Sequence, residues 1–401
     1  MKNNAKIKER EQANRPTGKQ ANRKTIPYAT QWIENDDIEA VVSALKSTNL
    51  TQGPLVDSFE KKVADYCGAK YAVAVNSGTS ALHIACLAAG ISVGDEVITS
   101  PITFVASANC ILCCGGRPIF ADILDDTINI DPQEIKKKLT SKTKAIIPVH
   151  FTGNPCDLEE INQIACEKNL IVIEDAAHAL GAEYEGAKIG AGKFSDMTIF
   201  SFHAVKHITT GEGGMVLTNN EELYERLKFH RSHGITRDQK YLNKNNGIWY
   251  YEMHKLGYNY RLTDIQCALG ISQLKKLDRF VLRRREIAYK YNEAFRNFDR
   301  VAILKETPQA KSSYHLYVIM VKNRRSIFDK MREGGIIVNV HYIPAYLHPY
   351  YQQLGYQSGL CPNAETYYQG AITLPLYPKM SDEDVNYVIG TLKQAISEVG
   401  L

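Results

Sequence analysis

Ser201-Phe-His-Ala-Val-Lys206-His-Ile-Thr-Thr-Gly-Glu-Gly-Gly214 is the stretch around which the rest of the chain is organised. The pattern predicts a short apolar strand over Met197 to Phe202 and a second over Gly214 to Thr218, so Lys206 lies in their connection. The glycines that follow Lys206 permit unusual backbone angles and close approach of a ligand. Most lysines are solvated surface residues, whereas a partly desolvated one has a lowered pKa and a nucleophilic amine. The stretch alone leaves both interpretations open.

Short apolar runs alternate with helical patterns through the first two thirds of the chain. Strands that are apolar throughout and separated by helices are typical of a mostly parallel sheet with helices on both faces. The sequence therefore predicts an α/β domain whose ligands sit beyond the carboxyl ends of the strands. The predicted strands are Tyr71 to Val75, Glu96 to Thr99, Pro118 to Ala121, Ala145 to Val149, Leu170 to Ile173, Met197 to Phe202 and Gly214 to Leu217.

The chain has 401 residues, which is too long for one small core and predicts a large domain plus a smaller one. We expect a basic, disordered leader over 1–26, a large domain with N-terminal helical segments over 27–260, and long linking helices with a small α+β domain over 261–401. In this last part, Leu262 to Phe298 predicts one or two long helices and Ile336 to His341 a strand. The apolar stripe expected on the long helices is Ile265, Leu269, Ile271, Leu274 and Leu277.

The composition is that of an ordinary soluble protein, with 44% hydrophobic and 23% charged residues. No apolar run is long enough to cross a bilayer and no signal-peptide pattern is present, so we expect a cytoplasmic protein. The nine cysteines show no paired CxxC spacing, which predicts reduced thiols and no metal site. Residues 1–24 are basic but lack aromatic residues and an apolar face, so we expect no nucleic-acid or membrane partner and no loss of activity on their deletion.

Three further motifs precede Lys206, and each has a structural alternative. Asn76-Ser-Gly-Thr-Ser-Ala-Leu82 follows a strand and opens a helix, where it could hold a phosphate or supply an ordinary N-cap. Asp175, at a strand end, could hold a protonated ring nitrogen with His178 nearby, or could cap a helix while His178 packs. Phe104 could stack on a flat heteroaromatic ring or pack in the core.

The order of these motifs says more than any one of them. A phosphate loop, an aromatic residue, a strand-end aspartate with a histidine, and a lysine in a glycine-rich turn follow one another along the chain. Phosphate, flat ring, pyridinium nitrogen and aldehyde are the four features of pyridoxal 5'-phosphate. The sequence therefore predicts a pyridoxal phosphate site with Lys206 as the cofactor lysine.

The same motifs carry a resemblance to a known family. Together with Glu174-Asp-Ala-Ala-His-Ala-Leu-Gly181 and Gly257-Tyr-Asn-Tyr-Arg-Leu262, they resemble the sugar aminotransferases of the DegT/DnrJ/EryC1/StrS family, from about Tyr28 to the C-terminus. The resemblance implies the aspartate aminotransferase fold (fold type I) and an obligate homodimer with shared active sites. It implies that Lys206 bonds the cofactor and moves the substrate proton, while Asp175 pairs with the ring nitrogen. The other implied cofactor contacts are Phe104 on the ring, His178 near its hydroxyl, Gly78, Thr79 and Ser201 on the phosphate, and Asn259 from the partner subunit.

The substrate side rests on weaker motifs. Several stretches resemble the subgroup that aminates a UDP-linked 4-keto-6-deoxy-HexNAc sugar at C4, with L-glutamate as donor, in pseudaminic acid synthesis. Sibling enzymes that act at C3 or on a GDP- or dTDP-sugar, and a non-catalytic cofactor-binding regulator or scaffold, remain alternatives. His207 departs from the pattern expected beside the lysine. The candidate substrate-binding residues are Arg231, His233 and Arg261, which could instead be surface charge, and the His341–Tyr342 segment.

Overall fold

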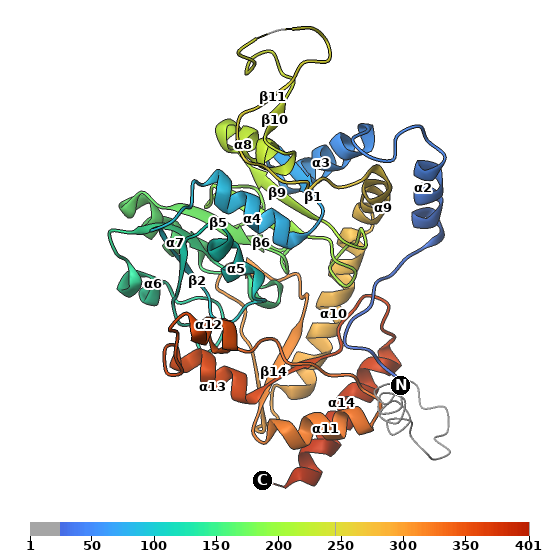
Figure 1. Cartoon of the computed structure of the whole chain (residues 1–401). Coiled ribbons are helices and arrows are strands. Elements are labelled where there is room, and N and C mark those ends of the chain that lie inside the picture. The colour runs from blue at the N-terminus through green and yellow to red at the C-terminus, as the bar shows by residue number, and fades with distance from the viewer. Residues whose placement is uncertain (1–24, 245, 401) are drawn as a thin grey trace, which may run out of the picture.

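A seven-stranded sheet forms the centre of the computed structural model, which describes residues 25–244 and 246–400 (Figure 1). The strand order is β1-β9-β8-β5-β4-β2-β3. Strands β3, β2, β4, β5 and β8 run parallel to one another, and β9 runs antiparallel to both β8 and β1. The strands are β1 (Tyr71–Val75), β2 (Glu96–Thr99), β3 (Arg117–Phe120), β4 (Thr143–Ile147), β5 (Ile171–Asp175), β8 (Met197–Ser201) and β9 (Gly214–Thr218).

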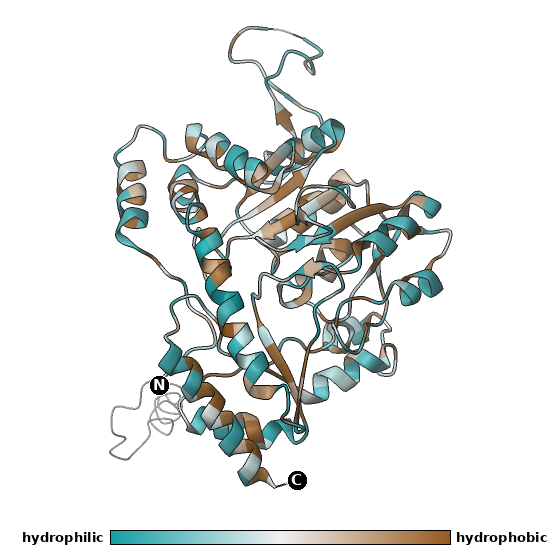
Figure 2. Ribbon diagram, turned by 180° about the vertical axis from the view of Figure 1, so that it is seen from behind, coloured by the Kyte–Doolittle hydropathy of each residue, from teal (hydrophilic) through white to brown (hydrophobic). Residues whose placement is uncertain are grey.

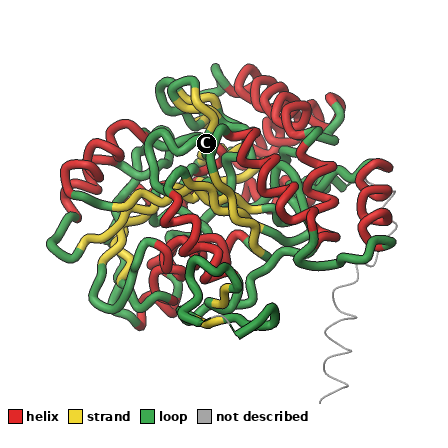
Figure 3. Tube along the Cα trace, turned by 90° about the horizontal axis from the view of Figure 1, so that it is seen from above, coloured by secondary structure: helices red, strands yellow, loops and turns green. Residues whose placement is uncertain are grey.

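Helices cover both faces of this sheet, as the view from above shows (Figure 3). Successive strand residues enter opposite cores: Val73 and Val75 pack with α4, whereas Ala72 and Ala74 pack with α3. Because both faces are covered, most residues of these strands are apolar and buried (Figure 2). The predicted α/β fold is confirmed. The helices of this domain are α3 (Pro54–Cys67), α4 (Gly78–Ala88), α5 (Ala106–Cys113), α6 (Pro132–Lys138), α7 (Leu158–Lys168) and α8 (Glu221–Arg231).

The C-terminal part forms a smaller α+β unit with its own core. Its three-stranded sheet has the order β12-β14-β15 and is antiparallel throughout. The strand predicted over Ile336 to His341 was wrong, because this segment makes only isolated bridges, at Ile336 and Asn339. The elements here are α10 (Leu277–Phe295), β12 (Val301–Ile303), β14 (Tyr317–Val321), α11 (Arg324–Glu333), β15 (Ala371–Leu374) and α14 (Asp382–Val399).

Helix α2 (Asn35–Leu45) packs on α9 (Asp264–Leu274) through polar side chains. Gln273 Nε2 donates to Asp37 at 2.7 Å, and Lys276 lies 2.8 Å from the same carboxylate. The apolar stripe predicted on α9 is therefore not its most buried face, since Cys267, Gly270, Ser272 and Gln273 are buried instead. On α2, the apolar residues Ile38, Val42 and Leu45 are exposed.

A hairpin arm rises from the body of the molecule between β10 (Ile235–Thr236) and β11 (Glu252–Met253) (Figure 1). The arm carries exposed apolar side chains, among them Ile248 at 98% and Trp249 at 71% exposure. In the part of the chain that the structure describes, no helix is long and apolar enough to span a membrane.

Candidate active site

A cavity of about 720 Å³ opens beyond the carboxyl ends of the parallel strands, where the fold places ligands. Its lining includes the end of β5, the start of α4, the loop after β2 and the connection between β8 and β9. Nine of the predicted cofactor- and substrate-binding residues meet there. The lining includes Gly78, Thr79, Phe104, Asp175, His178, Ser201, Lys206, His341 and Tyr342.

Lys206 sits in a turn between β8 and β9, as predicted. Its backbone N–H donates to the His203 carbonyl at 2.9 Å, and its amine lies 3.3 Å from Nε2 of His315. Burial lowers the pKa of the Lys206 ammonium to about 8, while the charge of Asp175 opposes this shift. The amine is therefore far closer to its neutral, nucleophilic form than an exposed lysine.

Asp175 is the last residue of β5 and is almost fully buried. Ser107 Oγ donates to one carboxylate oxygen at 2.5 Å, and the Ala177 N–H donates to the other at 3.2 Å. Burial raises the pKa of Asp175 above its ordinary value, although these hydrogen bonds favour the carboxylate. A buried carboxylate with few donors is suited to pair with a cationic ring nitrogen.

The start of α4 forms a second wall of the cavity. Ser77 caps the helix by accepting from the Ser80 N–H, so the ordinary N-cap interpretation holds alongside the cavity position. Gly78 lies against Ser201, because a Cβ at Gly78 would come within 2.9 Å of the Ser201 Cβ. Gly214 must also lack a side chain, since its Cβ would lie 2.4 Å from the Ser77 carbonyl oxygen. The helix N-terminus, with its positive potential, thus lies directly beside the lysine connection.

Aromatic and imidazole rings form the opposite wall. Phe104 is 60% exposed, which removes the core-packing alternative, and its ring lies 6.4 Å from that of Tyr342. The Tyr342 hydroxyl is 3.3 Å from His178 Nε2. Nδ1 of His178 is buried without a hydrogen-bond partner among the described residues. Burial lowers the pKa of His178 well below its ordinary value and that of His341 to about 4, so both rings are neutral.

The comparisons with known proteins agree with this geometry. The model of the DegT/DnrJ/EryC1/StrS aminotransferase family matches residues 31–393. The chain belongs to this family. Among the similar curated proteins, the spore coat polysaccharide biosynthesis protein SpsC of Bacillus subtilis is 42% identical over 92% of this chain and 97% of its own length. The UDP-4-amino-4,6-dideoxy-N-acetyl-beta-L-altrosamine transaminase of Campylobacter jejuni is 40% identical over 93% of this chain and 98% of its own length. The GDP-perosamine synthase of Escherichia coli is 36% identical over 94% and 100%.

Solved structures of related proteins confirm the fold of this aminotransferase. Helicobacter pylori PseC, described as an aminotransferase of pseudoaminic acid biosynthesis, superimposes with a TM-score of 0.87 at 35% identity, over 94% of this chain and all of the other. The sugar aminotransferase Spr1654 of Streptococcus pneumoniae, in a PLP-form, gives a TM-score of 0.88 at 32% identity over 94% and 100%. The predicted aspartate aminotransferase-like architecture and enzyme class are thereby confirmed.

Four predicted residues of the aminotransferase lie outside this cavity. Arg231 lies 2.6 Å from Glu60, donates to the Ala74 carbonyl at 3.3 Å and does not line this cavity, so its role in binding the substrate's diphosphate stays a prediction. His233 is exposed at the base of the arm. Asn259 and Arg261 lie beside the end of β1 without lining the cavity.

The sequence interpretation missed several residues of the site. Ser107, which donates to Asp175, gave no signal because it lies within a helical pattern. Tyr28, Asn339 and His315 also line the cavity but come from segments far along the chain. These partners are brought to the cavity by the tertiary fold, and no local motif marks them.

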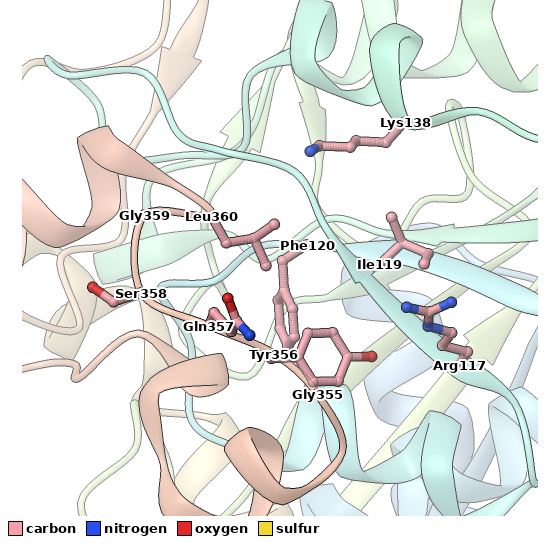
Figure 4. Close-up of a pocket in the computed structure, with 10 residues that line it drawn as sticks. All are labelled: Arg117, Ile119, Phe120, Lys138, Gly355, Tyr356, Gln357, Ser358, Gly359 and Leu360. Atoms are coloured by element: carbon pink, nitrogen blue, oxygen red, sulfur yellow. The ribbon is translucent and has the colours of Figure 1, made fainter.

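A second hollow of about 430 Å³ lies along the outer edge of β3, against the loop before α13 (Pro362–Gly370). Figure 4 shows Arg117 and Lys138 on its rim, around Phe120 and Tyr356. The Tyr356 hydroxyl donates to the Pro118 carbonyl at 2.5 Å. None of the predicted site residues of the aminotransferase lines this hollow.

Proposed function

We propose that the chain moves the amino group of L-glutamate to the C4 keto group of a UDP-2-acetamido-2,6-dideoxy-4-hexulose, with pyridoxal 5'-phosphate as cofactor. The observation that carries the proposal is the placement of the Lys206 amine and the Asp175 carboxylate on one cavity with the start of α4. The choice of substrate is supported by the transaminase of Campylobacter jejuni, which is 40% identical along nearly the whole chain. We place the reaction in pseudaminic acid synthesis and in the cytoplasm.

The residues present fit the cofactor. His178 Nδ1 is a buried polar atom without a partner among the described residues, and such atoms normally find one. Asp175 supplies an anion for the ring nitrogen, and Phe104 an exposed ring face for stacking. Gly78, Thr79 and Ser201 would hold the phosphate at the helix N-terminus. Pyridoxal phosphate, when bound, supplies an aldehyde carbon that carries nitrogen and a ring that accepts electrons.

Lys206 has the properties that a proton carrier in both half-reactions needs. Its pKa of about 8 lies close to neutral pH, so the amine can take a proton from a substrate carbon and return it. The neutral His178 and His341 add no competing positive charge beside it. The buried Asp175 would keep negative charge on the ring side of the cavity.

We propose that residues of both subunits contact the ligands of one active site. His341 and Tyr342 line this chain's own cavity and would face the sugar nucleotide. Asn259 would reach the phosphate of the cofactor in the partner subunit of a homodimer, and His233 and Arg261 would contribute to binding only from there. Exposed apolar side chains on α2 and on the arm support such a dimer.

The decisive experiment offers a panel of UDP-, GDP- and dTDP-linked ketosugars to the enzyme after incubation with glutamate, with the aminated products identified by NMR. We expect release of 2-oxoglutarate and amination at C4 of the UDP sugar. The similarity to a GDP-perosamine synthase favours a GDP sugar as the alternative substrate. Amination of a GDP sugar alone would therefore replace our substrate assignment.

Replacing Lys206 by Arg tests the catalytic assignment itself. The Lys206→Arg protein keeps the positive charge but lacks an amine that can bond the cofactor, so turnover and the glutamate-induced change in the cofactor spectrum should both vanish. The half-exposed Lys193, changed to Arg in the same way, should leave both intact. An active Lys206→Arg enzyme would refute the assignment, and a bound cofactor that glutamate never changes in the wild type would favour the scaffold alternative.

A further inference from the structure

His315 contacts the Lys206 amine from a distant part of the chain. It precedes β14, and its Nε2 lies 3.3 Å from the lysine Nζ. The His315 ring is buried between two other imidazoles, with its centroid 4.4 Å from that of His178 and 5.5 Å from that of His207. The contact is therefore formed inside the protein, where a hydrogen bond is not weakened by water.

The segment that carries His315 is held on several sides at Ser313. The Ser313 N–H donates to the Gly153 carbonyl at 3.0 Å, and its hydroxyl donates to the His178 carbonyl at 3.2 Å. His207 Nε2 lies 3.1 Å from the Ser313 carbonyl, which gives this unexpected neighbour of the lysine a definite partner. Gly153 has a φ of +96°, and a Cβ there would lie 2.6 Å from the His178 carbonyl. The close approach of these segments thus depends on a glycine.

The backbone at His315 is fixed from below by α10. The buried Arg284 donates through Nη1 to the carbonyls of Tyr314, at 3.3 Å, and of His315, at 3.2 Å. Tyr314 has a φ of +47°, a conformation that costs a bulky residue energy and persists only where its surroundings impose it. The structure therefore uses strained backbone and a buried guanidinium to set the direction of one imidazole.

The charges around His315 make its ring neutral. Burial, together with the positive charges of Lys206 and Arg284 and the neighbouring His178 and His207, holds the pKa of His315 well below its ordinary value. Its Nδ1 is buried and has no hydrogen-bond partner among the described residues. Burying an N–H that has no acceptor costs more free energy than burying a nitrogen lone pair that has no donor. The single ring hydrogen of the neutral His315 therefore belongs on Nε2, which faces the amine, and not on Nδ1.

We propose that His315 is a positioning residue that donates a hydrogen bond from Nε2 to the neutral amine of Lys206 and holds this amine ready whenever it is not bonded to the cofactor. No proton is transferred in this contact. The inference rests on the proposed function, because it gives Lys206 its role there. The bond exists only with the neutral amine, so it favours that form over the ammonium.

The test measures the pKa of Lys206 in the full-length, cofactor-free protein by trace acetylation across pH 6 to 11 (a range of about five units around the expected pKa) with mass spectrometry of the lysine peptide. His315→Asn places its amide near Nδ1 and cannot reach the lysine, whereas the longer side chain of His315→Gln can. We expect the pKa of Lys206 to rise by roughly half to one unit in His315→Asn and to stay near the wild-type value in His315→Gln. His230→Asn, at another buried histidine whose Nδ1 lies 3.3 Å from the Leu256 carbonyl, should cause no shift.

An unchanged or lowered pKa in His315→Asn, or an equal shift in His315→Gln, would overturn the proposal. If circular dichroism shows that His315→Asn does not fold, histidine-selective ¹⁵N NMR of the wild type can instead determine which ring nitrogen of His315 carries the hydrogen. The signal of His315 is identified as the one missing from the His315→Gln spectrum. Hydrogen on Nε2 supports the proposal and hydrogen on Nδ1 overturns it. Neither measurement uses a sugar substrate, so failure here leaves the ketosugar experiment unaffected, and the reverse also holds.

Discussion

At the scale of single residues, the site keeps a carboxylate that the fold alone would not favour. Burial raises the pKa of Asp175, so its ionisation costs more in the native state than in the unfolded chain. This cost begins above the ordinary pKa of the carboxyl, grows as pH rises toward the native pKa and is constant above it. Asp175 therefore lowers stability at neutral pH, and in the proposed function it supplies the charge opposite the cofactor ring.

Asp175→Asn should separate these two effects. The neutral amide removes the buried charge, so the cofactor-free protein should gain about 1 kcal/mol in free energy of unfolding at pH 7.5. Turnover should fall by about 10²-fold or more, because the ring nitrogen loses its anion. Urea unfolding and steady-state rates measure the two effects. The exposed Asp65, changed to Asn as a control, should alter neither by more than about 0.5 kcal/mol, and an active Asp175→Asn enzyme would contradict the assigned role.

Lys206 predicts a pH dependence of stability of the opposite sense. Its pKa is about 8 in the folded protein and 10.5 when unperturbed, so the unfolded state binds more protons between these values. The resulting penalty, about 3 kcal/mol at most, is full below pH 8 and disappears as pH rises toward 10.5. Cofactor-free Lys206→Met should therefore be more stable than the wild type at pH 7 and lose this advantage by pH 10.5. Thermal unfolding across this range measures the difference, and a constant difference would exclude the depressed pKa.

At the scale of elements, one buried ion pair joins α8 to α3 and β1. Arg231 on α8 meets Glu60 on α3, and Glu60 also accepts from the Ala74 N–H of β1 at 2.7 Å. Burial raises the pKa of Glu60, and the guanidinium opposes this shift. The pair thus fixes the position of α8 on the sheet.

Arg231→Met should leave the Glu60 carboxylate buried without a cation and cost roughly 3 kcal/mol of unfolding free energy. Lys228→Met, which breaks an exposed pair on the same helix, should cost less than about 1 kcal/mol. Denaturant unfolding measures both, and KM for the sugar nucleotide should be unchanged in folded Arg231→Met. A stable variant with a raised KM would instead support the predicted substrate-binding role of Arg231.

The sequence predicted the strands well and side-chain partners poorly. Largely buried strands such as β5 and β8 contain short apolar runs, and Lys206 stands out because glycines follow it. The partner of Arg231 is Glu60, 171 positions away, and no local pattern reveals such a contact. The contact of His315 with Lys206 was missed for the same reason, because the two residues are 109 positions apart in the chain. The stripe on α9 was misjudged because that helix buries small and polar residues against α2 and α3.

At the scale of the whole molecule, the apolar surface of α2 is the face that the proposed homodimer would bury. Its residues Ile38 and Leu45 are each 54% exposed, while the polar side of the helix faces α9. Leu45→Glu combined with Ile38→Glu should raise the dimer dissociation constant at least about tenfold, since two charges would enter an apolar contact. Sedimentation equilibrium measures it. Val93→Glu, at a single residue that is 86% exposed, should leave the constant unchanged, and a wild-type monomer at micromolar concentration would refute the homodimer.

The reversal of β9 has a consequence for the whole sheet edge. Strand β8 differs from the other parallel strands because the next strand in the chain, β9, is also its antiparallel neighbour in the sheet. Residues 202–213 connect the two strands, and Ser201 pairs with Gly214. The Phe202 N–H donates to the Gly213 carbonyl at 2.8 Å, so a hydrogen bond joins the first and last residues of the lysine turn. Because both ends of the turn are fixed to the sheet, we expect an added or deleted residue between 202 and 213 to displace the amine, whereas surface loops elsewhere can absorb such changes. Loop length, as much as residue type, is part of this catalytic site.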